Sequence, residues 1–351
     1  MRIRSLRIDS FRNLASVSLD AGERINWLHG LNGAGKTSVL EAIHVLGRGR
    51  SFRTTRMSVL TRDGEDRFRI VAETDDPEHR LGLERTGTEW TGRIDRQPCR
   101  KMSEFAQALP LVLIDPENHL LVEGGPALRR SYLDWGLFHV EPSYLADWQR
   151  YRRLLRQRNA ALRDRADSAV MAALEAPMAS AAACVERHRE DYILRLRAHV
   201  EELESQLEFQ LPALELAYQP SAVKAEDYLN LWSEHRVRDL EQGFTREGPH
   251  RGELAIRSNA RRAAPRFSRG QMKLAALVLK LAQMRLAGDV GRQPILLLDD
   301  PVSELDAHHL ERLMSWIATQ THQTWITAVE PPATLPARRF HVEQGKIRSV
   351  V

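Results

Sequence analysis

One eight-residue stretch near the N-terminus limits the fold more than any other feature: Gly30-Leu31-Asn32-Gly33-Ala34-Gly35-Lys36-Thr37. It has the spacing G-x-x-x-x-G-K-[ST], follows a short apolar run at 25–29 and precedes a helical pattern at about 36–46. Glycines at these positions let the backbone wrap around a phosphate group, because a side chain would block its close approach. The stretch therefore predicts an α/β fold with a phosphate-binding loop between a strand and a helix.

The same spacing assigns chemistry to individual groups of this loop. Successive backbone N–H groups and the N-terminus of the following helix attract an anion. We expect Lys36 to reach the β- and γ-phosphates of ATP, and the Thr37 hydroxyl to bind Mg²⁺. The predicted ATP-binding residues are Gly30, Leu31, Asn32, Gly33, Ala34, Gly35, Lys36, Thr37 and Ser38.

A second motif supplies carboxylates. The apolar run Ile295–Leu298 is typical of a strand buried on both faces, and Asp299 and Asp300 follow it directly. Ligands of open α/β sheets bind at the carboxyl ends of the strands, so we expect both side chains in the binding crevice. Asp299 is predicted to hold Mg²⁺, directly or through water, and Asp300 to polarise the attacking water. With Lys36, they are the predicted catalytic residues.

The distance between the motifs indicates an insertion. About 260 residues separate Lys36 from Asp299, more than a small P-loop fold needs. The intervening chain contains a stretch rich in Ala, Leu, Arg and Glu, in which Pro177 is expected to kink or start a helix that ends at Pro212. The sequence therefore predicts a head domain formed by residues 1–125 and 212–351, with residues 126–211 inserted as a helical arm.

Two further motifs resemble those of ABC ATPases. Phe267-Ser268-Arg269-Gly270-Gln271, ahead of a helical stretch, is similar to the S-x-G-Q signature, and Ser303-Glu304-Leu305-Asp306 is similar to the D-loop. In that superfamily these segments reach across a dimer, where the signature caps the γ-phosphate bound by the second subunit. An ordinary helix N-cap by Ser268 is the alternative. The residues that the resemblance places at the dimer interface are Ser268, Gly270, Gln271 and Asp306.

Two parts that ABC ATPases usually carry are not evident. The switch histidine is expected after the strand that contains Thr327, but Thr327 occupies its place and His322 comes before the strand. This substitution predicts slow ATP hydrolysis. Gln97 and Gln107 are candidates for the Q-loop glutamine by their position only.

Taken in order, the motifs resemble the RecF family of ABC/SMC-like ATPases over nearly the whole chain. The last of the family's marks, Gly248-Pro249-His250-Arg251, is usually followed by two acidic residues, whereas Gly252-Glu253 stands here. The resemblance implies an α/β fold, with an ABC-type ATPase head of mixed sheets plus helices and an inserted α-helical arm. It also implies ATP and Mg²⁺ as cofactors, ATP-dependent dimerisation, binding of double-stranded DNA and gap junctions, and cooperation with RecR and RecO in loading RecA. The other marks are 1–3, 11–14, 46–54, 115–117, 125–134 and 158–159.

Arginine is concentrated in the predicted arm. Residues 129–165 contain nine arginines, no lysine and four acidic residues, and residues 48–62 contain five arginines and no acid. Dense arginine is typical of a nucleic-acid surface, although it is also found on an ordinary solvated helix face. The DNA-binding candidates are Arg129, Arg130, Arg152, Arg153 and Arg156. Aromatic residues at helical spacing in the same segment are predicted to be core: Tyr132, Trp135, Phe138, Tyr144, Trp148 and Tyr151.

Other classes of protein remain as alternatives. A nucleotide-binding subunit of an ABC transporter or another SMC/Rad50-like ATPase would share the motifs, and a non-enzymatic scaffold would have lost some of them. The N-terminus has no signal-peptide pattern and no 18-residue apolar run occurs, so no membrane partner is expected. Cys99 and Cys184 have neither metal-site nor disulfide spacing, which favours the reducing cytoplasm.

Overall fold

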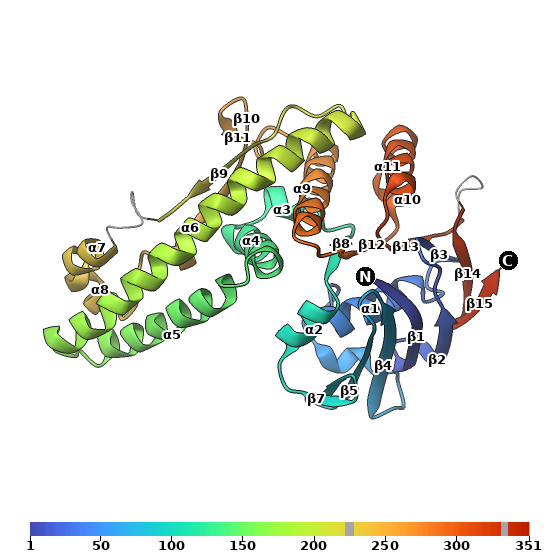
Figure 1. The fold of residues 1–351 in the computed structure, drawn as a ribbon, viewed down its shortest axis with the longest axis horizontal. Coiled ribbons are helices and arrows are strands. Elements are labelled where there is room, and N and C mark those ends of the chain that lie inside the picture. The colour runs from blue at the N-terminus through green and yellow to red at the C-terminus, as the bar shows by residue number, and fades with distance from the viewer. Residues whose placement is uncertain (222–227, 331–335, 351) are drawn as a thin grey trace. The chain divides into compact units, whose positions relative to one another are not determined.

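The computed structural model describes residues 1–221, 228–330 and 336–350. The chain forms two compact units, each assembled from separate stretches of sequence, and Figure 1 traces both. The first unit comprises Met1–Asn118, Gln206–Phe209 and Ala287–Val351. The second comprises His119–Ser205 and Gln210–Leu286.

The first unit contains an antiparallel sheet with the strand order β2-β1-β4-β5-β6-β7. Buried and exposed residues alternate along its strands, so one face forms core and the other faces solvent. The alternation of apolar and polar residues in the sequence predicts the two N-terminal strands and those that contain Phe68 and Leu81, and the structure confirms all four. The strands are β1 (Arg2–Phe11), β2 (Leu14–Asp20), β4 (Arg67–Asp75), β5 (His79–Thr86), β6 (Glu89–Ile94) and β7 (Gln97–Cys99).

The second sheet of this unit has the order β15-β14-β3-β13-β12-β8, and all its strands except β15 run parallel. Its central strands are buried along their whole length, as expected for a parallel sheet covered on both faces. The carboxyl ends of these strands therefore meet at one edge. The strands are β3 (Ile25–His29), β8 (Leu111–Ile114), β12 (Ile295–Leu298), β13 (Thr324–Ala328), β14 (Arg338–Glu343) and β15 (Lys346–Val350).

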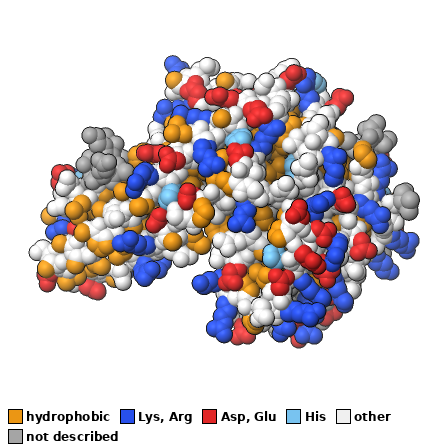
Figure 2. All heavy atoms as spheres, viewed as in Figure 1, with side chains coloured by type: hydrophobic (Ala, Val, Ile, Leu, Met, Phe, Trp, Pro, Cys, Tyr) orange, Lys and Arg blue, Asp and Glu red, His pale blue; other side chains and the backbone are white. Residues whose placement is uncertain are grey.

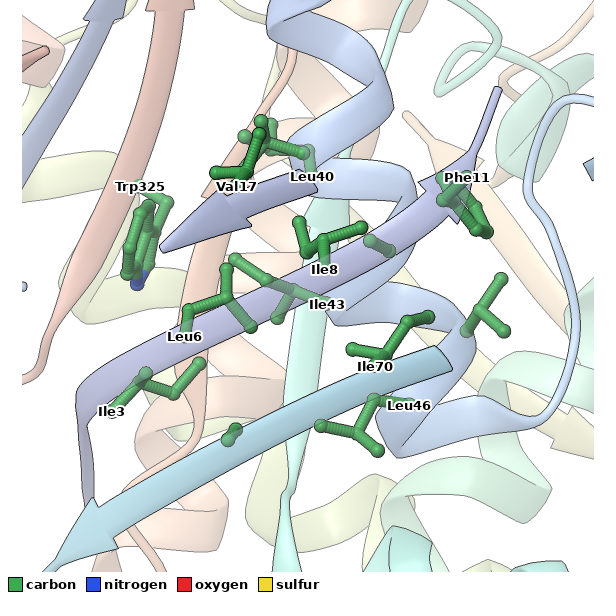
Figure 3. Packing of buried hydrophobic residues seen from close by; sticks show 14 of the residues in the cluster. Ile3, Leu6, Ile8, Phe11, Val17, Leu40, Ile43, Leu46, Ile70 and Trp325 are labelled. Carbon is green, nitrogen blue, oxygen red and sulfur yellow. The ribbon is translucent and has the colours of Figure 1, made fainter. Parts of the chain in front are cut away.

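Helix α1 (Lys36–Arg48) lies in the core shared by the two sheets. Figure 3 shows Leu40 and Ile43 of this helix among Ile8 of β1, Ile70 of β4 and Trp325 of β13. Helix α1 is buried from Ser38 to Gly47, and its buried Glu41 forms an ion pair of 2.7 Å with Arg12. The other helices of this unit are η1 (Met57–Leu60), α2 (Met102–Ala108), α10 (Pro301–Glu304) and α11 (Ala307–Thr319).

The second unit is mainly helical, with the small antiparallel sheet β11-β10-β9. Strand β10 packs against α4, and Arg129 of α4 forms an ion pair of 2.6 Å with Glu253 of β10. The elements are α3 (Leu120–Glu123), α4 (Pro126–Val140), α5 (Tyr144–Arg163), α6 (Ser168–Leu207), β9 (Glu215–Gln219), α7 (Tyr228–Glu234), α8 (Arg236–Gln242), η3 (Pro249–Arg251), β10 (Glu253–Ser258), β11 (Arg261–Arg262) and α9 (Arg269–Asp289).

The division into compact units differs from the predicted division into head and arm. Residues 210–286, which the sequence assigned to the head from 212 onward, are grouped with the helices. The physical reason is the packing of β10 on α4 and the buried ion pair between them. Helix boundaries also differ, because α6 begins at Ser168 and runs through Pro177, where a start or a kink was expected. The division into a head and an inserted arm that fold as separate domains stays a prediction.

Buried charges connect the helices of the second unit. Arg158 is fully buried and contacts Glu175 at 2.9 Å and Asp239 at 2.8 Å, and Arg189 contacts Asp134 at 2.8 Å. Such groups need partners, because an unpaired buried charge costs several kcal/mol. Of the predicted core aromatics, Tyr132, Trp135, Tyr144 and Tyr151 are buried, whereas Phe138 and Trp148 are half-buried.

Among the described helices, α6 is long and apolar enough to cross a membrane by length and composition, which the count of uninterrupted apolar residues did not reveal. The core helix of a protein that does not cross a membrane can have the same length and composition. Glu175 and Glu186 of α6 are buried and hydrogen-bonded to Arg158 and Tyr228 of the second unit. The helix therefore has the polar contacts of a core helix.

His250 belongs to the family motif Gly248–Arg251, and both nitrogens of its ring form hydrogen bonds. Nε2 is 3.2 Å from the Thr245 carbonyl, which can only accept, so Nε2 carries the proton. Nδ1 then accepts from the Tyr151 hydroxyl at 2.6 Å. Burial lowers the pKa of His250 to about 4. The neutral ring is therefore part of the folded structure.

This arrangement predicts a loss of stability in mild acid. The unfolded chain binds a proton at His250 near pH 6.5, whereas the folded chain resists it until about pH 4. The free energy of unfolding should therefore fall by roughly 2 kcal/mol between pH 7.5 and pH 5 from this group alone. Urea unfolding of the wild type and of His250→Gln across this range measures the difference, and parallel pH profiles would contradict the assignment.

Candidate nucleotide-binding site

The phosphate-binding loop joins the carboxyl end of β3 to the N-terminus of α1, as the sequence predicts. Gly33 has φ +79°, and a Cβ at this position would meet nothing within 4 Å, so its open side can receive a ligand. Gly35 has φ +117°, and a Cβ there would lie 2.9 Å from Asn13 Nδ2. Only glycine satisfies both the backbone angle and the space at position 35.

Lys36 is buried inside this loop. Its Nζ donates to the carbonyl oxygens of Gly30 at 2.6 Å and Leu31 at 3.0 Å. Burial lowers the pKa of its amine, while Asp300 and Asp299 oppose that shift. The amine and the first N–H groups of α1 therefore form a compact cationic pocket of the kind that binds phosphate.

Asp299 lies immediately after β12 and is bound by two hydroxyl groups. Thr37 Oγ1 and Thr327 Oγ1 each donate to Asp299 Oδ1 at 2.8 Å. Burial raises the pKa of Asp299, and the two hydrogen bonds oppose this by stabilising the carboxylate. The structure thus brings together Thr37 and Asp299, the two residues predicted to hold Mg²⁺.

The donor set suits a hard divalent cation. A carboxylate and a hydroxyl oxygen 2.8 Å apart beside a phosphate loop are the ligands that Mg²⁺ prefers, since it binds through oxygen and shares phosphate oxygens. Thr37 and Asp299 would therefore hold the ion. Its chemistry would be to neutralise charge on the β- and γ-phosphates.

Asp300 has an uncommon backbone conformation, with φ 50° and ψ 53°. Its N–H donates to Thr327 Oγ1 at 2.8 Å, and its carboxylate accepts from Ser303 Oγ at 2.6 Å. The Thr327 hydroxyl thus contacts both carboxylate residues, because it accepts from one backbone and donates to the other side chain. It is a positioning residue that the sequence identified only as the replacement for a histidine.

His322 is excluded as a switch residue by its place on the strand. It precedes β13, whereas the site lies at the carboxyl end of that strand, beyond Ala328. Neither Q-loop candidate follows a strand of the parallel sheet, because Gln97 is on β7 and Gln107 on α2. The loop after β8 does, since Ile114 pairs with Leu298 beside Asp299.

The N-terminal hairpin also contributes to the site, through a residue whose role the sequence did not reveal. Asn13 Nδ2 donates to the carbonyl oxygens of Gly33 at 3.3 Å and Ala34 at 3.1 Å, and its Oδ1 accepts from Ser38 Oγ at 3.0 Å. The side chain therefore holds the loop and the first turn of α1 together. Its place in the family pattern at 11–14 was the only signal in the sequence.

The signature segment forms a capping box at the start of α9. The Ser268 N–H donates to Gln271 Oε1 at 2.9 Å, and the Gln271 N–H donates to Ser268 Oγ at 3.2 Å. Ser268 and Gly270 remain exposed. Asp306 likewise caps α11 by accepting from the His309 N–H at 3.0 Å. The local capping role is therefore present, and a role across a dimer stays a prediction.

The arginine candidates divide into two groups. The structure does not support Arg129 as a DNA contact, because it is buried against Glu253 and the carbonyls of Val122 and Gly124. Arg130 is half-buried and donates to the Gly252 carbonyl. The others are exposed on α5, and no ion pair engages them within the described residues: Arg152, Arg153 and Arg156.

The fold and the site define an ATPase head of the ABC/SMC type. The model of the RecF/RecN/SMC N terminal domain matches residues 2–341. The chain is 39% identical to the DNA replication and repair protein RecF of Pseudomonas entomophila, over 99% of this chain and 98% of that protein. It is 38% identical to the protein of the same name from Thioalkalivibrio sulfidiphilus, over 99% of both chains.

A solved structure of the recombination mediator protein RecF-ATP in the RecFOR pathway superposes with a TM-score of 0.88. It is 26% identical and matches 100% of this chain and 98% of that one. The chain belongs to the RecF family. The predicted resemblance is thereby confirmed.

The contacts of Thr327 predict a split between binding and turnover. Thr327→Val keeps the shape but removes the hydroxyl that orients Asp299 and accepts from Asp300, so turnover should fall roughly tenfold or more, at about 1.4 kcal/mol per factor of ten. ATP affinity should stay within about threefold, because Lys36 and the loop are unchanged. Steady-state hydrolysis and equilibrium nucleotide binding measure the two effects. Thr327→Ser should restore turnover, and wild-type turnover by the valine variant would contradict the role.

Proposed function

We propose that this protein is an ATP-dependent DNA-binding switch of recombinational repair and replication. In this proposal ATP closes two copies into a dimer, the dimer binds double-stranded DNA and gap junctions, and it helps RecR and RecO load RecA in the cytoplasm. The single observation that carries it is the meeting of Lys36, Thr37 and Asp299 at one edge of the parallel sheet, in a chain of this family.

ATP is the nucleotide that the site supports best. The loop offers its backbone donors and the Lys36 amine to phosphates, and Thr37 and Asp299 offer oxygen ligands to Mg²⁺. A related RecF structure is designated RecF-ATP, which adds support. Asp300, next in the chain, would accept a proton from water or orient it, and the absence of a histidine at position 327 fits slow hydrolysis.

A second copy of this chain is the proposed cover of the nucleotide. Leu31 in the loop is 77% exposed, and Val302 and Val329 are 45% and 42% exposed on neighbouring segments. The Gly30 N–H donates to the Val329 carbonyl, so Leu31 and Val329 lie close together. This apolar rim fits burial in a protein contact. The exposed N-terminus of α9 at Ser268 carries the partial positive charge that a γ-phosphate attracts.

DNA is the proposed ligand of α5. Arg152, Arg153 and Arg156 project from one stretch of this helix without ion pairs among the described residues. Guanidinium groups bind phosphate in a bidentate manner and fix position without reading sequence. A transporter subunit would not require such a basic helix, so this observation favours the DNA-binding function over that alternative.

The dimer proposal predicts that Ser268→Arg separates ATP binding from association. A bulky cation at the capping position should leave ATP affinity within about threefold, because Ser268 belongs to neither the loop nor β12. Sedimentation with ATP and Mg²⁺ should show this variant as a monomer at concentrations where the wild type dimerises.

Ser268→Thr keeps the cap hydroxyl and is the matched control, which should still dimerise. Lys36→Ala should bind no ATP and remain monomeric. A dimeric Ser268→Arg protein would contradict capping by a second copy. A wild type that ignores ATP would contradict the proposed function as a whole.

The α5 proposal predicts a charge-specific loss of DNA binding. Replacing Arg152, Arg153 and Arg156 together by Gln should weaken binding to gapped duplex roughly tenfold or more. It should also reduce the slope of log K against log salt by up to about 0.9 for each phosphate that the protein no longer neutralises. The control triple changes the same charge on exposed arginines elsewhere in the second unit, namely Arg238, Arg246 and Arg261. Equal losses from both triples would indicate net charge rather than a site.

A further inference from the structure

The solvent-facing side of the antiparallel sheet contains a hollow lined by arginine that the nucleotide site does not use. Its volume is about 250 Å³, and its lining residues are Arg69, Val71, Arg80, Gly82, Arg93 and Arg96. A smaller hollow of about 190 Å³ adjoins it through Arg69, Val71 and Arg80, and extends to Arg7 of β1 and Glu73 of β4. We call the first of these the arginine hollow. Figure 2 shows Lys and Arg side chains gathered over the region that β4 and β5 occupy in Figure 1.

The strand register explains why these arginine side chains surround a space above the small residues Val71 and Gly82. Val71 pairs with Gly82, and this row continues to Arg7 on one side and Arg93 on the other. Arg69 and Arg80 lie two pairs away from the row, on opposite sides of it. Because alternate residues of a strand share a face, all of these side chains project from the same side of the sheet. The two small central residues leave space that the arginines enclose.

The charge around the hollow is only partly balanced by acids. Its lining contains four arginines and no carboxylate. Arg80 lies 3.7 Å from Glu73, but within the described residues no ion pair engages Arg69, Arg93 or Arg96. The arginines next to the hollow are paired with acids, since Arg7 lies 3.0 Å from Asp9 and Arg67 lies 3.6 Å from Glu84. Three of the four arginines that line the hollow therefore have no ion-pair partner within the described residues.

The geometry points to the phosphates of duplex DNA as the occupant of this surface. The row from Arg7 to Arg93 crosses three strand spacings, about 14 Å in total. Along one DNA strand, phosphates recur about every 3.4 Å of helix axis, so the distance from Arg7 to Arg93 spans about four of them. A single phosphate would need arginines that converge on one point, whereas these spread across the sheet. The surface offers guanidinium groups and no base-reading element, so it would position the duplex without selecting its sequence.

This inference rests on the proposed DNA-binding function and adds a second contact surface on the first unit. The α5 arginines belong to the second unit. A duplex that needs both surfaces responds to changes on either one. The contribution of the hollow is therefore measurable while the α5 arginines stay intact.

The test uses the full chain with ATP and Mg²⁺, a gapped duplex and a salt series. Replacing Arg69, Arg93 and Arg96 together by Gln should weaken binding about tenfold or more and reduce the salt slope by up to about 0.9 per phosphate released, equally for unrelated sequences. The matched control triple replaces exposed arginines of the same unit outside the hollow, namely Arg100, Arg292 and Arg348. It should bind within about threefold of the wild type.

Gly82 allows a second, independent variant. A Cβ at Gly82 would lie 4.0 Å from Val71 Cγ2, an ordinary contact, and the residue has no positive φ. Gly82→Glu therefore places a carboxylate among the arginines without strain, and should weaken DNA binding as much as the triple with no loss of thermal stability. Gly82→Gln, of the same size but neutral, should weaken it less.

Two results would overturn the inference. In the first, the wild type binds DNA, and both the variant with Arg69, Arg93 and Arg96 replaced by Gln and Gly82→Glu bind it with the same affinity as the control triple. In the second, inorganic tripolyphosphate displaces the gapped duplex as effectively as unlabelled duplex does at the same phosphate concentration. That result would indicate a site for small anions. A wild type that binds no DNA would instead refute the proposed function itself.

Discussion

The structure of the first unit depends on the burial of α1 in the core shared by two sheets. Leu40 and Ile43 of this helix pack with residues of both sheets, and the chain can enter the helix only through the glycine loop after β3. The helix axis therefore fixes where the loop places its backbone donors. At its first turn, Lys36 is buried and Thr37 is in contact with Asp299 of a different strand. A hydrophobic constraint thus determines the geometry of a polar site.

Asp299 couples segments that are remote in sequence. Its Oδ1 atom accepts from Thr37, which follows the phosphate loop, and from Thr327 of β13, while the backbone of Asp300 donates to the same Thr327. A change at Thr37 is therefore transmitted to Asp299 through one hydrogen bond, and from Asp299 to the backbone of Asp300 through two more that meet at Thr327. Because these groups are buried, the interactions are little screened by salt or water. This arrangement gives a direct physical route from nucleotide chemistry to the segment around Asp300 and Ser303, which the proposed dimer would contact.

The sequence predicted the parts of this structure that local pattern controls. Alternation gave β1, β2, β4 and β5, the continuous apolar run gave β12, and the glycine spacing gave the loop. The sequence did not predict the features that depend on contacts between residues far apart in the chain. Pro177 did not begin a helix, because buried Glu175 and neighbouring residues hold the surrounding turns of α6 against the rest of the second unit. The ion pair of Arg129, the bridging role of Thr327 and the contacts of Asn13 each join residues far apart in the chain, and no single-sequence pattern encodes such partners. The arginine hollow was missed for the same reason, because its side chains come from different strands.

The proposed nucleotide and DNA sites would bind phosphate in two physically different ways. The nucleotide loop uses backbone donors and one buried amine, fixed before a ligand arrives, so its attraction is short-range and little weakened by dissolved ions. The arginines of α5 and of the arginine hollow lie at the surface and apart from one another, so their attraction is long-range and screened at physiological salt. A nucleotide held by the first kind of site stays bound under conditions that release a polyanion from the second. Regulation by ATP then needs no competition between the two ligands, because nucleotide binding has only to change how the exposed arginines of two copies are presented to one duplex.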